Sequence, residues 1–209
     1  MTKALVLYYS AFGYVAVVAN AIAEGARSAG ADVDIKRVPE FAPTATASEG
    51  AYFNALQEVP VALVEDLASY DAIIVGSPTR FGRLSAPVAA FLEQATGIAS
   101  LGILNGKVGG AFASPTSRNG GHESAAMSIV TNLLHFGMIV VGPPYSATTM
   151  ADATGQRHPS VLDLEGARAH GWLIAQTAQR LSGRIASGAE ALEPGAVPEA
   201  ARTLEAIAP

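Results

Sequence analysis

The chain has 209 residues, carries a formal net charge of −5 and contains no cysteine. Its 13 basic residues are scattered singly, which argues against a nucleic-acid or anionic-membrane surface. The lack of cysteine excludes disulfides, thiolate metal ligands and a cysteine nucleophile. Half of the residues are hydrophobic, and this length suits one α/β domain with a sizeable core. Because no apolar run reaches the roughly 18–20 residues of a membrane span, we expect a soluble, cytoplasmic protein without membrane insertion.

The first strand and the turn after it carry the first functional signal. Residues 3–9 form an apolar run typical of a strand covered on both faces, and helical spacing begins at Tyr14 or Val15 without a gap. Such a turn directs backbone N–H groups at one point, where a phosphate can bind. Ser10 adds a hydroxyl and Gly13 permits close backbone approach. Neither a G-x-G-x-x-G fingerprint nor a Walker lysine is present, so the pattern favours a phosphate monoester or a plain strand–helix connection.

The remaining chain alternates strand and helix patterns. Apolar periodicity predicts strands over 31–38, 71–76, 107–114 and 138–141, and helices over 15–29, 64–69, 86–96, 123–136 and 161–181. Long irregular stretches are expected over 41–58, with one helical turn near 52–56, and over 142–159. This alternation predicts a doubly wound parallel sheet with helices on both faces.

Polar residues and glycines concentrate in three loops at the predicted carboxyl ends of strands, over 10–15, 78–82 and 114–121. Ligands of doubly wound sheets bind beyond these ends, so we expect the site there. From residue 183 the composition changes to Ala, Glu, Pro and Gly. We therefore expect a domain over 1–182 and a tail over 183–209, either flexible or docked on a neighbouring subunit through a short helix from Pro198.

Several motifs share their pattern with one family. They are Leu7-Tyr-Tyr-Ser10 with Gly13, Pro78-Thr-Arg-Phe-Gly82 after an apolar strand, Gly120-Gly121, and His135-Phe-Gly-Met138. Over residues 3 to about 182 the chain resembles the flavodoxin-like quinone oxidoreductases of the WrbA type. The resemblance implies a five-stranded sheet of order 2-1-3-4-5 with bound FMN. It also implies two-electron reduction of quinones or similar flat acceptors by NADH or NADPH, and a homo-oligomer, dimer or tetramer.

The resemblance also assigns site residues. The FMN phosphate would be held by Ser10, Phe12, Gly13, Tyr14 and Val15. The isoalloxazine and ribityl chain would be lined by Pro78, Thr79, Arg80, Phe81 and Gly82, with backbone N–H groups of the 80–82 turn on the pyrimidine edge. The third wall would comprise Ser114, Thr116, Ser117 and Gly121, with His135 near the open face of the flavin.

Arg80 and His135 are the candidate catalytic residues. Each retains an ordinary alternative: Arg80 a surface ion pair, and His135 a complement to its helix dipole. Phe81 either lines the flavin or lies in the core. The other histidines, His122, His158 and His170, lack metal-ligand spacing, so we expect them on the surface or in loops and expect no metal.

Two departures from the family concern the substrate. Ala99 stands where the family has a tryptophan, and the loop after Val141 is shortened. The first functional hypothesis is an FMN-dependent NAD(P)H:quinone oxidoreductase with ping-pong kinetics, because both substrates would use one flavin face.

The second hypothesis is a flavodoxin-like electron carrier between protein partners. The mild net charge and the arginines Arg80, Arg83 and Arg118 in the flavin loops disfavour it. The third is a flavin-free interaction module. Hydrolase chemistry is disfavoured because no G-x-S-x-G elbow occurs.

Overall fold

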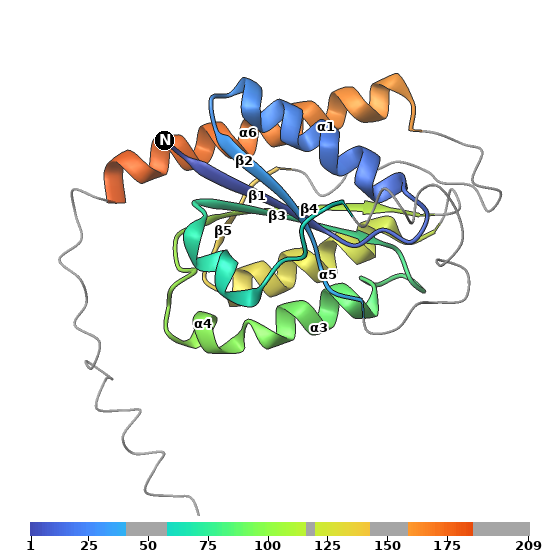
Figure 1. Ribbon diagram of the computed structural model, residues 1–209, viewed down its shortest axis with the longest axis horizontal. Helices are drawn as coiled ribbons and strands as arrows, with labels where there is room; N and C mark the ends of the chain where they lie inside the picture. The colour runs from blue at the N-terminus through green and yellow to red at the C-terminus, as the bar shows by residue number, and fades with distance from the viewer. Residues whose placement is uncertain (41–57, 116–119, 143–158, 186–209) are drawn as a thin grey trace, which may run out of the picture.

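Five parallel strands form one sheet at the centre of the molecule (Figure 1). The structure, a computed structural model, describes residues 1–40, 58–115, 120–142 and 159–185. The strands are β1 (Lys3–Tyr8), β2 (Asp32–Arg37), β3 (Ala72–Pro78), β4 (Val108–Ser114) and β5 (Ile139–Val140). Their order is β2-β1-β3-β4-β5, which confirms the predicted flavodoxin-like topology.

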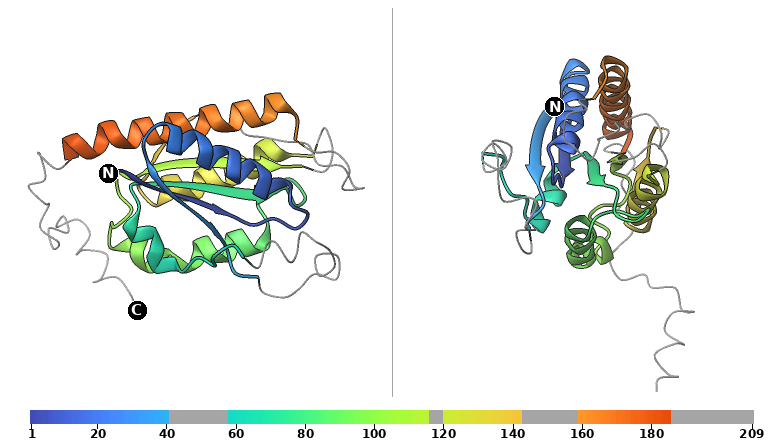
Figure 2. Two further views of the ribbon diagram at one scale, coloured as in Figure 1. Left: turned by 45° about the horizontal axis from the view of Figure 1, so that its top comes forward. Right: turned by 90° about the vertical axis from the view of Figure 1, so that its right-hand side faces the viewer.

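Helices cover both faces of the sheet, as the end-on view in Figure 2 shows. One face carries α1 (Tyr14–Ser28) and α6 (Val161–Ile185); the other carries α3 (Ala86–Gln94) and α5 (His122–His135). Alternate residues of β1 enter the two cores: Val6 packs on the α1–α6 side and Leu5 and Leu7 on the other. Burial on both faces explains why this strand reads as a continuous apolar run.

Helices α1 and α6 approach each other at glycines. A Cβ on Gly25 would collide with the carbonyl oxygen of Arg168, and one on Gly171 with the carbonyl oxygen of Ile22. Arg168 also donates a hydrogen bond to Glu24 at 2.8 Å. The two helix backbones are therefore in direct contact, which holds α1 firmly on the sheet.

Some element boundaries differ from the predictions. The segment over 86–96 is divided into α3 and a short α4 (Thr96–Ser100), and the segment over 64–69 is a 3-10 helix, η1 (Val64–Ser69). Strand β5 comprises two residues instead of four, and α6 continues four residues beyond 181 to Ile185. The irregular stretches over 41–57 and 143–158, and the tail over 186–209, lie outside the described residues. No helix among the described residues is long and apolar enough to span a membrane.

Three loops leave the sheet at one edge. Tyr8 pairs with Gly76, and Pro78 pairs with Ser114, so β1, β3 and β4 end side by side. We call this the carboxyl edge of the sheet, and the end where β3 and β4 begin the amino edge.

Candidate functional site

The turn after β1 presents the beginning of α1 to the carboxyl edge. The amide of Gly13 donates to the Ser10 hydroxyl oxygen at 3.1 Å, and Gly13 has a left-handed φ of 93°. No side chain caps α1 at Gly13, and its first turn contains no acidic residue. An anion placed here faces helix N–H groups and the positive end of the helix dipole.

The second loop is a tight hairpin. The amide of Arg80 donates to the Arg83 carbonyl at 2.9 Å, and the amide of Arg83 to the Arg80 carbonyl at 3.2 Å. Between them Phe81 and Gly82 have φ values of 53° and 76°, as a type I′ turn requires. The Phe81 side chain is 101% exposed, which excludes the core alternative. The Arg80 amide thus donates within the hairpin, and contacts of the turn amides with the pyrimidine edge stay a prediction.

Two buried serines fix the base of this loop, and the sequence interpretation gave neither of them a role. The amide of Ser85 donates to the Ser77 hydroxyl oxygen at 2.8 Å, and the two hydroxyl oxygens lie 3.1 Å apart. Ser85 precedes helix α3, so its sequence position indicates a helix cap, yet its hydroxyl makes no cap hydrogen bond. The pair instead joins the end of β3 to the beginning of α3 across the loop.

The third loop closes against the second. The amide of Thr79 donates to the Ser114 carbonyl at 3.0 Å, which joins the ends of β3 and β4. A Cβ on Gly121 would lie 2.9 Å from the Cα of Gly82, so α5 begins in close contact with the hairpin. Thr116 and Ser117 lie outside the described residues.

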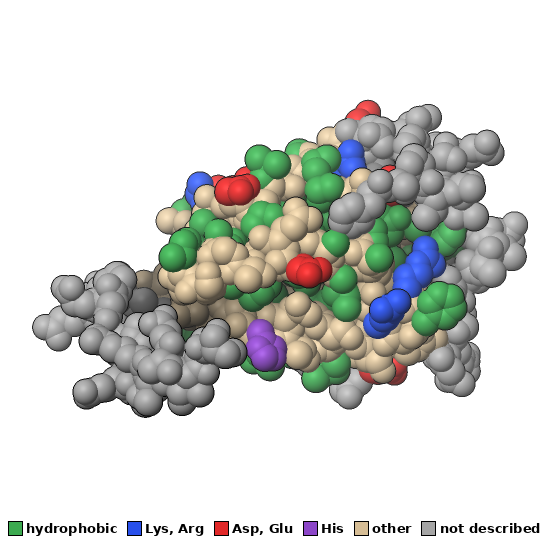
Figure 3. Space-filling model, turned by 90° about the horizontal axis from the view of Figure 1, so that it is seen from below, with side chains coloured by type: hydrophobic (Ala, Val, Ile, Leu, Met, Phe, Trp, Pro, Cys, Tyr) green, Lys and Arg blue, Asp and Glu red, His purple; other side chains and the backbone are tan. Residues whose placement is uncertain are grey.

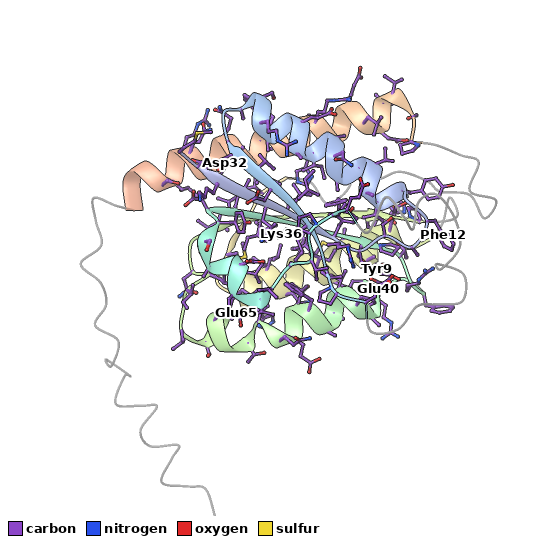
Figure 4. The ribbon with its side chains drawn as sticks, in the orientation of Figure 1. Tyr9, Phe12, Asp32, Lys36, Glu40 and Glu65 are labelled. Carbon is purple, nitrogen blue, oxygen red and sulfur yellow. The ribbon has the colours of Figure 1, made fainter. Side chains whose placement is uncertain are left out.

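A pocket opens where the three loops meet. Of the predicted residues, eight line it: Ser10, Phe12, Tyr14, Val15, Pro78, Thr79, Arg80 and Ser114. Ala11, which was not predicted, lines it as well. Four further predicted residues, Gly13, Phe81, Gly82 and Gly121, belong to the surrounding loops without lining the pocket itself. Figure 4 shows Phe12 at the end of the molecule opposite Asp32, which begins β2.

Two side chains of the pocket have features that suit a ligand. The Thr79 hydroxyl is buried and has no hydrogen-bond partner among the described residues. A buried polar group without a hydrogen-bond partner destabilises the folded protein, so a ligand that forms a hydrogen bond with this hydroxyl is favoured. The Arg80 guanidinium lies over the Phe12 ring, with Cζ 5.9 Å from its centroid. The carboxyl edge therefore offers an anion site, a hydroxyl and an aromatic–cationic wall in one depression.

The structure does not bring His135 to this pocket. It is the last residue of α5, and 14 helical residues carry the chain about 21 Å away from Gly121. Just beyond it, Gly137 and Ile139 bond to Gly106 and Lys107 at the amino edge. The prediction that His135 lies near the open face of the flavin is therefore wrong for the site formed by its own chain. Ala99 lies in α4 and packs against the core on the α3–α5 side, so it does not line this pocket either.

The remaining histidines differ from expectation. His170 is 3% exposed, so the prediction that it is a surface or loop residue is wrong. Its Nε2 lies 3.2 Å from the Val141 carbonyl oxygen, and burial lowers the pKa of its imidazole. His122 follows Gly121, contacts Glu123 at 3.1 Å and has a buried Nδ1 without a partner among the described residues. His158 lies outside these residues. No cluster of three or more potential metal ligands occurs within the described ranges.

Comparisons with known proteins agree with this geometry. A family model described as NADPH-dependent FMN reductase matches residues 2–153. A protein named NAD(P)H dehydrogenase (quinone) from Cupriavidus metallidurans is 55% identical over 200 residues, covering 88% of this chain and all of its own. A protein of the same name from Afipia carboxidovorans is 54% identical over the same shares.

Solved structures give the same result at the level of the fold. A WrbA-like flavodoxin protein from Agrobacterium tumefaciens superposes with a TM-score of 0.63 at 25% identity, covering 86% of this chain and 99% of its own. An archaeal flavodoxin superposes with a TM-score of 0.62 at 23% identity, covering 85% and 99%. The resemblance inferred from the sequence motifs is confirmed: this chain belongs to the NADPH-dependent FMN reductase family, together with relatives named NAD(P)H dehydrogenase (quinone).

Proposed function

We propose that this protein is an FMN-dependent oxidoreductase that transfers two electrons from NADH or NADPH to quinones or similar flat acceptors. The observation that carries the proposal is the pocket at the carboxyl edge. It joins the N-terminus of α1, where Gly13 has no side-chain cap, to the Thr79 hydroxyl, which has no partner among the described residues. The names of relatives more than 50% identical support the same activity.

The residues of the pocket fit FMN. The turn from Ser10 to Gly13 suits the phosphate, because helix N–H groups point there and no acidic side chain occupies the first turn. The Thr79 hydroxyl supplies a hydrogen-bonding group that needs a partner. Thr116 and Ser117 remain proposed FMN contacts, as does the surrounding backbone of Phe81, Gly82 and Gly121. When bound, FMN supplies a ring system that accepts a hydride and passes on two electrons.

Arg80 is the proposed catalytic residue of this chain. Its guanidinium lines the pocket and is held over Phe12 by a cation–π contact. A fixed positive charge beside the flavin site stabilises negative charge that develops there during reduction. Pro78 and Phe12 contribute apolar surface to the pocket lining.

We further propose ping-pong kinetics. A flavin bound in this pocket would offer one open face to both substrates, so the reductant and the acceptor would have to occupy that face in turn. Initial rates at several fixed quinone concentrations should give parallel double-reciprocal lines. Intersecting lines would contradict alternate occupancy without contradicting the activity itself.

The quaternary state and location are proposals as well. A homo-oligomer is supported by exposed apolar side chains near the amino edge, where Leu101 and Leu134 are 76% and 56% exposed. Light scattering on purified protein tests it, and cell fractionation tests the cytoplasmic location.

One experiment tests the function. The purified protein is loaded with FMN, separated from free flavin and mixed anaerobically with NADH or NADPH while the flavin absorbance is followed. We expect the absorbance to bleach and a benzoquinone to restore it in stoichiometric amount. A protein that retains no FMN supports the interaction module, and one that retains FMN but reacts with neither dinucleotide supports the electron carrier.

A further inference from the structure

Arg80 and Arg83 lie directly opposite each other across the hairpin. They exchange both backbone hydrogen bonds, at 2.9 and 3.2 Å, and form an antiparallel bridge. In such a pair the Cα atoms are about 5.5 Å apart and both side chains project from the same side of the ribbon. The two arginine side chains therefore leave the ribbon on the same side, and that of Arg80 lines the pocket.

Among the described residues this pair takes part in no ion pair. The ion pairs of the described residues join Lys36 to Asp66, His122 to Glu123 and Arg168 to Glu24. None of them includes Arg80 or Arg83. Like charges directly opposite each other in a β-ribbon are destabilising. The free hairpin thus carries an electrostatic cost that a bound anion would relieve.

The surroundings indicate what kind of anion fits. Phe81, between the two arginines, is fully exposed and holds a left-handed φ of 53° that an aromatic residue rarely adopts. Figure 3 shows basic side chains beside an exposed hydrophobic side chain at the end of the molecule where the loops converge. A flat aromatic surface next to paired guanidinium groups suits a nucleotide phosphate, because Arg binds phosphate bidentately and a base stacks on the ring.

This position is separate from the phosphate site at α1. Arg80 lines the pocket itself, whereas Arg83 is exposed on the far strand of the hairpin and does not line it. Arg83 is thus placed outside the FMN pocket and next to its opening, where a second substrate would enter.

We propose that Arg80 and Arg83 together bind a phosphate group of the reduced nicotinamide dinucleotide, with Arg83 as a substrate-binding residue that sets the affinity for the reductant. The proposal rests on the proposed oxidoreductase function. The phosphate has two possible sources, the pyrophosphate that NADH and NADPH share and the 2′-phosphate that only NADPH carries.

Calorimetric titration of the FMN-loaded protein tests the pair. The probes are ADP-ribose, which contains the pyrophosphate, and 2′-phospho-ADP-ribose, which contains both groups. Arg83→Ala should weaken binding about tenfold, the loss expected for one charge-assisted phosphate contact. If both probes weaken equally, the pair binds the pyrophosphate; if only 2′-phospho-ADP-ribose weakens, it binds the 2′-phosphate.

Two further variants control the result. Arg83→Lys keeps the charge but loses the bidentate geometry and should recover part of the affinity. Arg180→Ala removes the same charge from an exposed position on α6 and should bind both probes like the wild type. In steady state, Arg83→Ala should raise the KM for the affected dinucleotide, whereas Arg180→Ala should leave it as in the wild type.

The inference is overturned if Arg83→Ala binds both probes as tightly as Arg180→Ala does, or if it loses FMN along with the probes. Failure of the proposed function is seen separately, in wild-type protein whose bound FMN is reduced by neither NADH nor NADPH. Since the inference depends on that function, it falls in that case too, before any variant is made.

Discussion

The two edges of the sheet use their polar groups in opposite ways. At the amino edge they bond to each other: Lys107 donates to the carbonyls of Tyr70 and Ala68 at 2.6 and 2.8 Å, and the amide of Lys3 donates to Asp71 at 2.8 Å. At the carboxyl edge, Thr79 has a buried hydroxyl without a partner in the described ranges, and neither Arg80 nor Arg83 forms an ion pair there. The amino edge therefore serves stability, and the carboxyl edge keeps binding capacity for ligands.

The largest expected effect tests the carboxyl edge through Gly13. Gly13→Val places a β-branched residue at a φ of 93°, which distorts the phosphate turn. We expect FMN affinity to fall by more than about 100-fold, measured as flavin retained after gel filtration and by fluorescence titration.

Gly30→Val is the matched control, because Gly30 also has a left-handed φ, of 88°, but lies at the other end of α1. It should lose stability and keep FMN affinity once folded. A Gly13→Val protein with the flavin spectrum of the wild type would disprove the phosphate site.

Lys107 tests the amino edge. Lys107→Met leaves two carbonyl oxygens without their donor, so the free energy of unfolding in urea should fall by about 2 kcal/mol. FMN affinity should not change. Lys3→Met, at an exposed position, should stay within about 0.5 kcal/mol of the wild type. If Lys107→Met altered flavin affinity and not stability, the division between the two edges would be wrong.

Thr79 gives a smaller effect at the carboxyl edge. Thr79→Val removes the unpartnered hydroxyl while keeping the shape of the side chain. FMN affinity should fall about tenfold, and the stability of the flavin-free protein should be equal or higher, because no buried hydroxyl is left unsatisfied. Thr79→Ser keeps the hydroxyl and should retain most of the affinity. Equal flavin binding by the valine variant would remove Thr79 from the site.

The smallest effect is a pH dependence at Tyr70. Burial raises its pKa, as do the hydrogen bond to Asp34 at 2.8 Å and the nearby carboxylates. In the unfolded chain the tyrosine pKa is near 10. Because the pKa of Tyr70 is higher in the folded protein, its contribution to stability is fully present below pH 10 and is lost as the pH rises above that value. The stability advantage of the wild type over Tyr70→Phe should therefore shrink by about 1 kcal/mol between pH 9 and pH 11.

Urea unfolding at each pH measures this difference. Burial lowers the pKa of Lys107, which acts in the opposite direction, but both proteins contain Lys107 and its effect cancels. A constant difference across this range would show that the Tyr70 hydroxyl is not linked to folding.

The fold was predictable because its signals are local and repeated. Apolar runs indicated buried strands, and the spacing within 161–181 indicated one helix face. The burial of His170 could have been predicted from the same spacing. His170 follows Ala167 by three residues and precedes Ile174 by four, and Ala178 comes four residues later, so all four lie on the buried face of the helix.

The site was predictable only in part. The sequence predicted the meeting of three loops at one edge, and Ser10 and Thr79 line the pocket there. His135 was misplaced although the predicted helix over 123–136 already carries it to the opposite edge. The exposure of Phe81 was not predictable, because an aromatic residue at positive φ breaks the usual turn preferences. The Ser77–Ser85 contact depends on tertiary structure alone.

The glycine contact between α1 and α6 has a consequence for how quickly the protein acquires its cofactor. With Gly25 against Arg168 and Gly171 against Ile22, α1 cannot slide or turn on the sheet. In the proposed binding mode the phosphate meets an end of α1 that these contacts already hold in place, so binding requires no costly ordering of that helix. Enlarging either glycine would loosen this support and slow flavin uptake even in a chain whose phosphate turn is unaltered.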